Sequence, residues 1–182
     1  EMDMGDRLHN MMRRHAKGDR IGFLGPDNET AQNTAIYYNK EIFNGKMKIY
    51  LARTFEEFQN CFMDAQTEVD MLFVNNNAGI QGWDGAKADE FIMKNTVIPT
   101  GSTNAWMMRL VVFTIAKDSA EIGEMAGLMA VDILKGVRPS EIPVEKNKRA
   151  DIFINMELAN RLGLVLPLPL LKTAKKIRNN GN

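Results

Sequence analysis

The chain has 182 residues, 45% of them hydrophobic, and a formal net charge of +0. This length suffices to bury one sizeable core, and the balanced charge excludes a protein whose binding depends on nucleic-acid phosphates. His9 and His15 are poorly spaced on a predicted helix to share a metal ion, and the single Cys61 permits no internal disulfide. We therefore expect no metal, no cofactor and no nucleic-acid partner.

The predicted elements begin with a helix over residues 6–17. Four short apolar runs follow with starts roughly 25 residues apart, which is the spacing of strands that alternate with helices. They cover residues 20–24, 47–51, 71–74 and 97–99. The segments between the first three runs carry apolar residues at helical spacing, namely Ala31, Ala35, Tyr38, Ile42 and then Phe55, Phe58, Phe62, Ala65. Thr54 and Glu57 predict a capping box at the start of the second of these helices.

A fifth strand is predicted over residues 110–116, followed by a helix with Asp118 as its N-cap and Gly136 as its C-terminal stop. The apolar residues of that helix are expected to be buried, namely Ile122, Met125, Met129 and Ile133. The Pro-containing passage 137–150 is a candidate hinge or crossover, and residues 151–155 predict a strand near a sheet edge. Residues 170–178 are weakly amphipathic, and residues 179–182 are expected to fray.

This alternation of strands and helices predicts an α/β fold in which helices cover both faces of an open, mostly parallel sheet. The expected architecture is a three-layer sandwich of the flavodoxin-like type, formed by residues 1–182 as a single domain. Right-handed crossovers bring the carboxyl ends of the parallel strands to one edge, where open α/β sheets bind their ligands. Four loops follow these strand ends, at residues 25–30, 52–54, 75–79 and 100–104.

The loops supply the candidate ligand-binding residues. The run of three asparagines at 75–77 offers amides that donate and accept hydrogen bonds without net charge, although asparagines also favour plain turns. Hydroxyls at 100–103 form either an anion seat or an ordinary capped helix start. The two tryptophans provide an apolar platform or pack against the sheet edge. The full candidate set is Asp27, Asn28, Asn75, Asn76, Asn77, Trp83, Ser102, Thr103 and Trp106.

One long stretch adds a resemblance to a known family. Residues 125–167 read MAGLMAVDILKGVRPSEIPVEKNKRADIFINMELANRLGLVLP. The order of ILKG, RPSEIPVE, the FIN strand and the ELANRLGL helix resembles the C-terminal lobe of the ABC-transporter substrate-binding proteins, a branch of the periplasmic binding proteins. Upstream, DRIGFLGPD, VDMLFVNNNAGI and VIPTGSTNAW continue the likeness, which covers most of residues 18–172.

The resemblance implies a protein that captures a small solute outside the cytoplasm, in the periplasm or anchored to the membrane. It would deliver the solute to an ABC permease in the membrane, after hinge closure between two lobes. The matched motifs begin at the first strand, so the resemblance also implies either a missing N-terminal lobe or a one-lobe relative of the family. NNNAGI and Gly25-Pro26-Asp27 correspond to loops that face the cleft in the family.

Two alternatives accompany this interpretation. One is a sensor domain of the same fold, and the other is a flavodoxin-like enzyme or regulator that binds a nucleotide or flavin. The sequence contains neither a Gly-x-Ser-x-Gly elbow nor a His-Glu-x-x-His pattern. In the first loop, Pro26 removes an N–H and Asp27 adds a negative charge, which disfavours a phosphate site. We therefore expect a binding protein that is not an enzyme.

Overall fold

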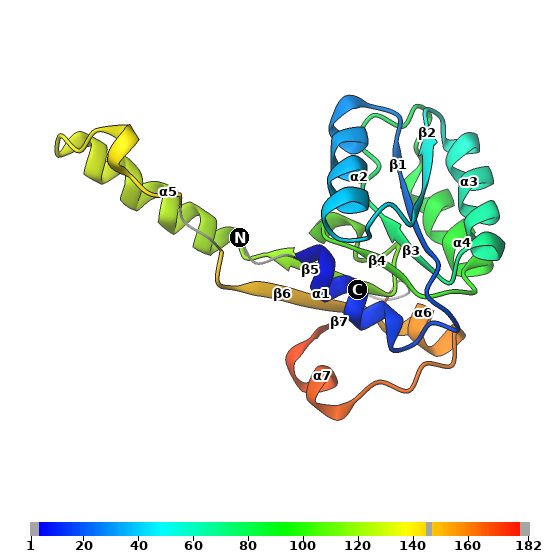
Figure 1. The fold of residues 1–182 in the computed structure, drawn as a ribbon. Coiled ribbons are helices and arrows are strands. Elements are labelled where there is room, and N and C mark those ends of the chain that lie inside the picture. Colours follow the sequence, from blue (N-terminus) through cyan, green and yellow to red (C-terminus); the bar gives the residue numbers. More distant parts are fainter. Residues whose placement is uncertain (1–3, 145–146, 179–182) are drawn as a thin grey trace.

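One mostly parallel β-sheet organises the chain, as Figure 1 shows for the computed structural model, which describes residues 4–144 and 147–178. The strand order across the sheet is β2-β1-β3-β4-β5-β6-β7. Neighbouring strands pair in parallel except β5 and β6, which are antiparallel. The strands are β1 (Ile21–Pro26), β2 (Met47–Ala52), β3 (Met71–Val74), β4 (Thr100–Ser102), β5 (Phe113–Lys117), β6 (Ala150–Asn155) and β7 (Lys175–Ile177).

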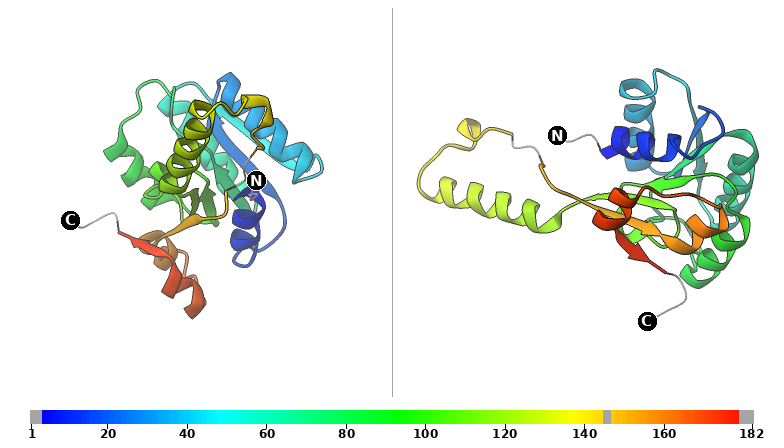
Figure 2. Two further views of the ribbon diagram at one scale, coloured as in Figure 1. Left: turned by 90° about the vertical axis from the view of Figure 1, so that its left-hand side faces the viewer. Right: turned by 90° about the horizontal axis from the view of Figure 1, so that it is seen from below.

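Helices cover both faces of the parallel part of the sheet, which explains why every residue of β1 and β3 is buried. Helices α1 and α2 lie on one face, and α3 and α4 lie on the other (Figures 1 and 2). These four helices are α1 (Met4–Arg13), α2 (Glu29–Glu41), α3 (Phe55–Glu68) and α4 (Gly85–Asn95). The remaining helices are α5 (Ser119–Leu134), α6 (Met156–Arg161) and α7 (Leu168–Thr173), with short 3-10 turns η1 (Ala105–Met107) and η2 (Pro139–Glu141).

The prediction of an α/β sandwich with a mostly parallel sheet is confirmed, but two of the predicted strands differ from expectation. The fourth strand is Thr100–Ser102 and not residues 97–99, because the N–H groups of Val97 and Ile98 bind the Gln66 side chain instead of a strand. The fifth begins at Phe113, after a buried turn. The strand at 150–155 lies near a sheet edge as predicted, and the edge strand itself, β7, is formed by part of the tail that was predicted to be weakly amphipathic.

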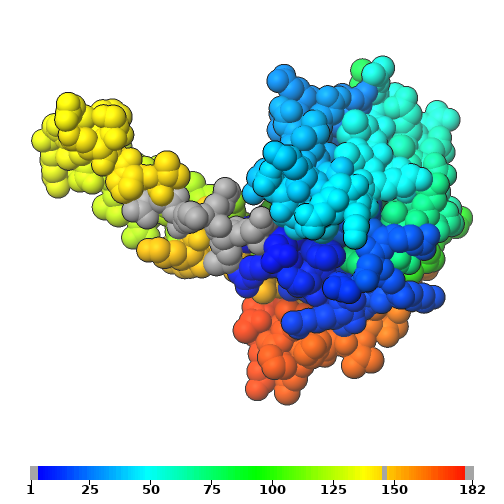
Figure 3. Space-filling model, viewed as in Figure 1, coloured from blue at the N-terminus to red at the C-terminus, as the bar shows by residue number. Residues whose placement is uncertain are grey.

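The prediction that α5 buries its apolar residues is wrong. Ile122 and Ile133 are each 44% exposed, and Met125 and Met129 are only half-buried. The helix and its return segment, residues 119–144, project from the sheet as an arm (Figures 1 and 3). The expected caps are nevertheless present, since Asp118 accepts the N–H groups of Ala120 and Glu121.

The arm ends and returns through well-defined hydrogen bonds. Gly136 has a φ of 99°, and its N–H donates to Ile133 while that of Val137 donates to Asp132, which closes the helix in a Schellman motif. At the root, the Glu121 carboxylate accepts the backbone N–H groups of Lys148 and Arg149. The hinge role of 137–150 stays a prediction, and the expected fraying of 179–182 concerns residues outside the described ones.

Two whole-chain features bear on function. Among residues 4–144 and 147–178, no helix is long and apolar enough to cross a membrane. Within the same residues, no three His, Cys, Asp or Glu side chains are grouped so that they could hold a metal ion.

Candidate functional site

A broad depression lies at the edge where β1, β3 and β4 end, and its volume is about 1320 Å³. We call it the polar depression. One side comes from α2, a second from the loops that follow β3 and β4, and a third from the end of β5 and the start of β6. Its polar and aromatic lining consists of Thr30, Asn33, Thr34, Tyr37, Tyr38, Asn75, Asn76, Thr103, Asn104, Trp106, Lys117, Ser119, Asp151 and Phe153.

The two loops after β3 and β4 are tied together beneath the depression. Ser102 Oγ donates to the carbonyl oxygen of Asn75 at 3.0 Å and accepts the N–H of Asn104 at 3.2 Å. The Asn104 side-chain nitrogen donates to the same carbonyl oxygen at 2.6 Å. Because β3 and β4 are parallel neighbours, their carboxyl ends and the polar groups that follow them lie side by side at one edge of the sheet. The loops that line the depression are thus positioned by their own hydrogen bonds.

The asparagine run serves as a turn and also lines the depression. Asn76 Oδ1 accepts the N–H of Ala78 at 2.8 Å, which is an Asx-turn. Among the described residues, the Asn76 amide nitrogen has no hydrogen-bond partner, so it is available to a ligand. Asn75 also lines the depression but is only 8% exposed. Asn77 does not line the depression, and its carbonyl oxygen accepts the N–H of Ile80 within the turn.

Thr103 and Trp106 also lie at the depression, and the Trp106 ring is 62% exposed. An exposed ring at a pocket rim can cover an apolar part of a ligand. Trp83 lies elsewhere, since its ring packs edge-on against Phe55 and Phe58 at centroid distances of 5.2 and 5.0 Å. The structure therefore separates the two tryptophans, with one at the candidate site and one against α3.

The remaining candidates make structural contacts away from the lining. Asp27 accepts from Arg53 Nε at 2.6 Å and from Gln32 Nε2 at 2.7 Å, and these contacts hold the pKa of its carboxyl below the usual range. Asn28 is the N-cap of α2 and accepts the N–H of Ala31. Ser102 is fully buried, because its hydroxyl is enclosed between the two loops.

Several lining residues were missed at the level of sequence. Thr30, Thr34 and Tyr37 lie at positions i, i+4 and i+7 of α2, next to its apolar face. This spacing places their polar groups on one side of the helix and could have indicated that they line a site. Asp151 had no such signal, because only the antiparallel pairing of β6 brings the start of that strand to this edge. Its carboxylate pairs with Lys175 Nζ at 2.7 Å.

The chemistry of the lining is that of recognition. Amides, hydroxyls and aromatic rings predominate, and the one lining carboxylate already has a cationic partner. Such a surface can hydrogen-bond a polar solute and cover its apolar part.

An open α/β sheet with such a depression at its carboxyl edge has the form of one lobe of a periplasmic binding protein. The sequence model of the family described as "ABC transporter substrate binding protein" matches residues 26–178. The chain therefore belongs to this family, as the resemblance in the sequence indicated. No curated protein sequence matches the chain significantly.

Three solved structures share the fold. A substrate-binding protein with adhesive properties from Clostridium difficile, in a ligand-free open form, has a TM-score of 0.70 at 19% identity, over 98% of this chain and 60% of that one. A conserved domain protein from Vibrio cholerae has a TM-score of 0.68 at 16% identity, over 95% and 60%. An ABC domain from Streptococcus pneumonia in complex with L-Trp has a TM-score of 0.61 at 19% identity, over 93% and 59%. The chain thus spans about 60% of the length of these proteins.

Proposed function

We propose that this chain is the C-terminal lobe of an extracytoplasmic substrate-binding protein. Its polar depression would supply half of the contacts to a small solute, which the whole protein delivers to an ABC permease after hinge closure. The observation that supports this most directly is the depression itself, which lies at the carboxyl edge of the sheet and is lined by amides, hydroxyls and an exposed indole. We assign no reaction to the chain.

The dimensions of the depression favour a site shared between two lobes. Its volume of about 1320 Å³ exceeds the roughly 300–1,000 Å³ of most closed ligand pockets. An open surface of this size leaves much of a small solute in contact with water. A second lobe that closes over it would complete the hydrogen bonds and exclude the water, and the ligand would then favour the closed arrangement.

The arm provides a second argument for a missing lobe. It exposes large apolar side chains, namely Ile122 at 44%, Leu128 at 62%, Val131 at 44% and Leu134 at 87%. Exposed apolar residues gathered on one element are typical of a surface that another protein part covers. Ser119 at the root of the arm lines the depression, so a lobe packed on the arm would lie beside the ligand. We propose that the N-terminal lobe of the same polypeptide covers this surface.

The ligand class that we propose to test first is the amino acids. The lining offers uncharged donors and acceptors at Asn76, Thr103 and Thr30, which suit a carboxylate and an ammonium group, and Trp106 suits a side chain. The similar structure from Streptococcus pneumonia was solved in complex with L-Trp. At 19% identity that complex suggests a starting point for the panel and does not fix the ligand.

Calorimetry on the two-lobed protein, with a panel of amino acids and other small metabolites, tests the proposal. Asn76→Ala and Thr103→Ala should each weaken binding roughly 2- to 150-fold, since losing one hydrogen bond to a ligand costs about 0.5–3 kcal/mol. Asn77→Ala is the matched control, because this side chain does not line the depression. The 182-residue chain alone should bind the same ligand weakly or not at all. Equal affinity for both proteins, or equal effects of all three variants, would contradict a site shared by two lobes.

The role of the arm has its own test. Leu128→Lys should leave the thermal unfolding of the 182-residue chain unchanged, because the side chain is 62% exposed here. In the two-lobed protein it should lower stability, because the charge would be buried between lobes. Asp132→Lys, on the same helix and exposed, is the control. If Leu128→Lys leaves the stability of the two-lobed protein unchanged, then the N-terminal lobe does not cover the arm.

A further inference from the structure

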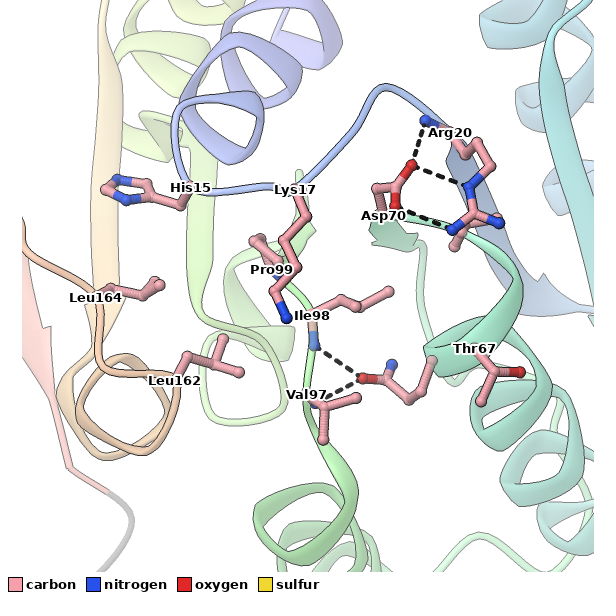
Figure 4. Close-up of a pocket in the computed structure, with 12 residues that line it drawn as sticks. His15, Lys17, Arg20, Thr67, Asp70, Val97, Ile98, Pro99, Leu162 and Leu164 are labelled. Carbon is pink, nitrogen blue, oxygen red and sulfur yellow. Dashed lines mark hydrogen bonds and ion pairs between the residues drawn. The ribbon is translucent and has the colours of Figure 1, made fainter.

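A second cavity lies at the opposite edge of the sheet, where β1, β3 and β4 begin (Figure 4). Its volume is about 300 Å³, and it shares no residue with the polar depression. The walls come from the segment between α1 and β1, from the end of α3, and from the residues that lead into β3 and β4. We call it the Gln66 pocket, after the side chain that defines its chemistry.

The amide of Gln66 is held in one orientation. The residue is 6% exposed, and its Oε1 accepts the N–H groups of Val97 at 2.7 Å and Ile98 at 3.2 Å. A flipped amide would point its own donors at these two donors, so the assignment is fixed. The Nε2 group is buried and has no hydrogen-bond partner among the described residues. Because an unpaired buried donor costs free energy, this position favours an acceptor supplied from outside the chain.

One cation at the pocket is not neutralised by a described neighbour. Arg20 and Asp70 form a double hydrogen bond, with both N···O distances at 3.0 Å, and so cancel each other's charge. The Lys17 side chain extends past Pro99 toward Ile98, as Figure 4 shows. Within the described part of the chain it has no acidic partner. His15 stacks on Phe113, and burial lowers its pKa, which keeps the ring mostly neutral at pH 7.

The rest of the pocket is apolar. Ile98 and Pro99 lie on one side, and Leu162 and Leu164 lie across from them in Figure 4. Val69, which is 3% exposed, contributes to the lining. A ligand that fits must therefore combine a negatively charged acceptor with an apolar body, and a volume of about 300 Å³ limits it to a small molecule.

We propose that the Gln66 pocket binds a small monocarboxylate. One carboxylate oxygen accepts from Gln66 Nε2, the charge faces Lys17, and the alkyl chain lies against Ile98, Leu162 and Leu164. This second site is independent of the proposed solute site, since it lies at the other edge of the sheet and within this lobe alone.

The probe is butyrate, added to the isotopically labelled 182-residue chain and followed by NMR. We expect a saturable shift of the Gln66 side-chain amide and of the Val97 and Ile98 amides, with a dissociation constant in the millimolar range. 1-Butanol tests the need for the charge, and inorganic phosphate tests the need for the alkyl chain. An equal response to either compound, or no response to butyrate, would overturn the proposal. A high-resolution crystal structure from butyrate solution that shows only a water molecule on Nε2 would also overturn it.

Gln66→Glu is the most informative variant. It keeps an acceptor for the N–H groups of Val97 and Ile98 but replaces the unpaired donor with an acceptor, so the fold should persist while butyrate binding weakens more than about tenfold. Lys17→Ala should weaken binding roughly 2- to 5-fold, as expected for an exposed ion pair. Lys135→Ala, at the far end of the arm, is the control and should bind normally. Undiminished binding by a folded Gln66→Glu protein would disprove the assigned contact, and circular dichroism separates this result from unfolding.

Discussion

The Ser102 hydroxyl donates to the carbonyl oxygen of Asn75 at 3.0 Å, at a point where Ser102 is fully buried. This contact joins the ends of two neighbouring parallel strands, just below the candidate ligand surface. Ser102, one of the candidate ligand-binding residues, is therefore buried below the open edge of the sheet. The residue supports the loops that line the depression, and its half-buried neighbour Thr103 is among the residues that line it.

Ser102→Ala should lower the free energy of unfolding of the chain by about 1–3 kcal/mol, because it removes the buried hydrogen bond to the Asn75 carbonyl and leaves the partly buried N–H of Asn104 without its acceptor. Thr103→Ala should change it by less than about 0.5 kcal/mol, as for other substitutions at partly exposed sites. Urea denaturation of both variants measures the difference. Similar values for the two would mean that the Ser102 hydroxyl does not hold the loops together.

The two tryptophans should report on different surroundings. Trp106, which is 62% exposed, should emit at long wavelength and be quenched readily by iodide, whereas Trp83, packed against Phe55 and Phe58, should be protected. Trp106→Phe should therefore remove the accessible component and leave thermal stability unchanged. Fluorescence of each single-tryptophan protein provides the measurement. An accessible Trp83 in the Trp106→Phe protein would show that its contacts with α3 are not formed.

The sequence predicted the elements that depend on local pattern. The buried runs at β1 and β3, the N-cap Asp118 and the Gly136 stop are all present because each depends on a few adjacent residues. Thr54 likewise caps α3 through Glu57 N–H, but the Glu57 carboxylate reaches the N–H of Arg53 and not that of Thr54.

What depends on distant contacts could not be predicted. The apolar spacing of α5 indicated a buried helix, yet Leu128 and Leu134 are 62% and 87% exposed. Periodicity shows which face is apolar and does not show what covers it. The same limit applies to the candidate site. Asp27 lies at the edge of the sheet where the ligand site was predicted. Its carboxylate, however, pairs with Arg53 from the next loop, so its role is structural.

The stability of the chain should fall as the pH is lowered from neutral to about 5. Burial, followed by nearby arginines, lowers the pKa of both His9 and His15 below the ordinary value of 6.5. The unfolded state then binds more protons than the folded state as the pH falls from 6.5 toward the folded pKa values, so the free energy of unfolding decreases across this window. Urea denaturation at several pH values measures the slope. The double variant His9→Gln, His15→Gln should flatten it, and an unchanged slope would assign the effect to other groups.

Side chains of α1 pack directly over Gly101 in β4, and substitution of this glycine tests whether that helix belongs to the core. A Cβ at Gly101 would lie 2.8 Å from Leu8 Cδ1 and 2.9 Å from Met12 Sδ. Both of those side chains are fully buried, so neither can move aside freely. Gly101→Ala should therefore lower the free energy of unfolding by about 1–3 kcal/mol, the usual cost of overpacking a core.

Gly85→Ala is the matched control, because a Cβ there meets nothing within 4 Å, and it should change stability by less than about 0.5 kcal/mol. Urea denaturation gives both values, and hydrogen exchange of the α1 amides shows where the damage falls. In the Gly101→Ala protein those amides should exchange faster, because the added methyl group displaces the helix from β4. If the Gly101→Ala protein is as stable as the Gly85→Ala protein and its α1 amides exchange at the normal rate, then α1 does not pack on β4 in solution.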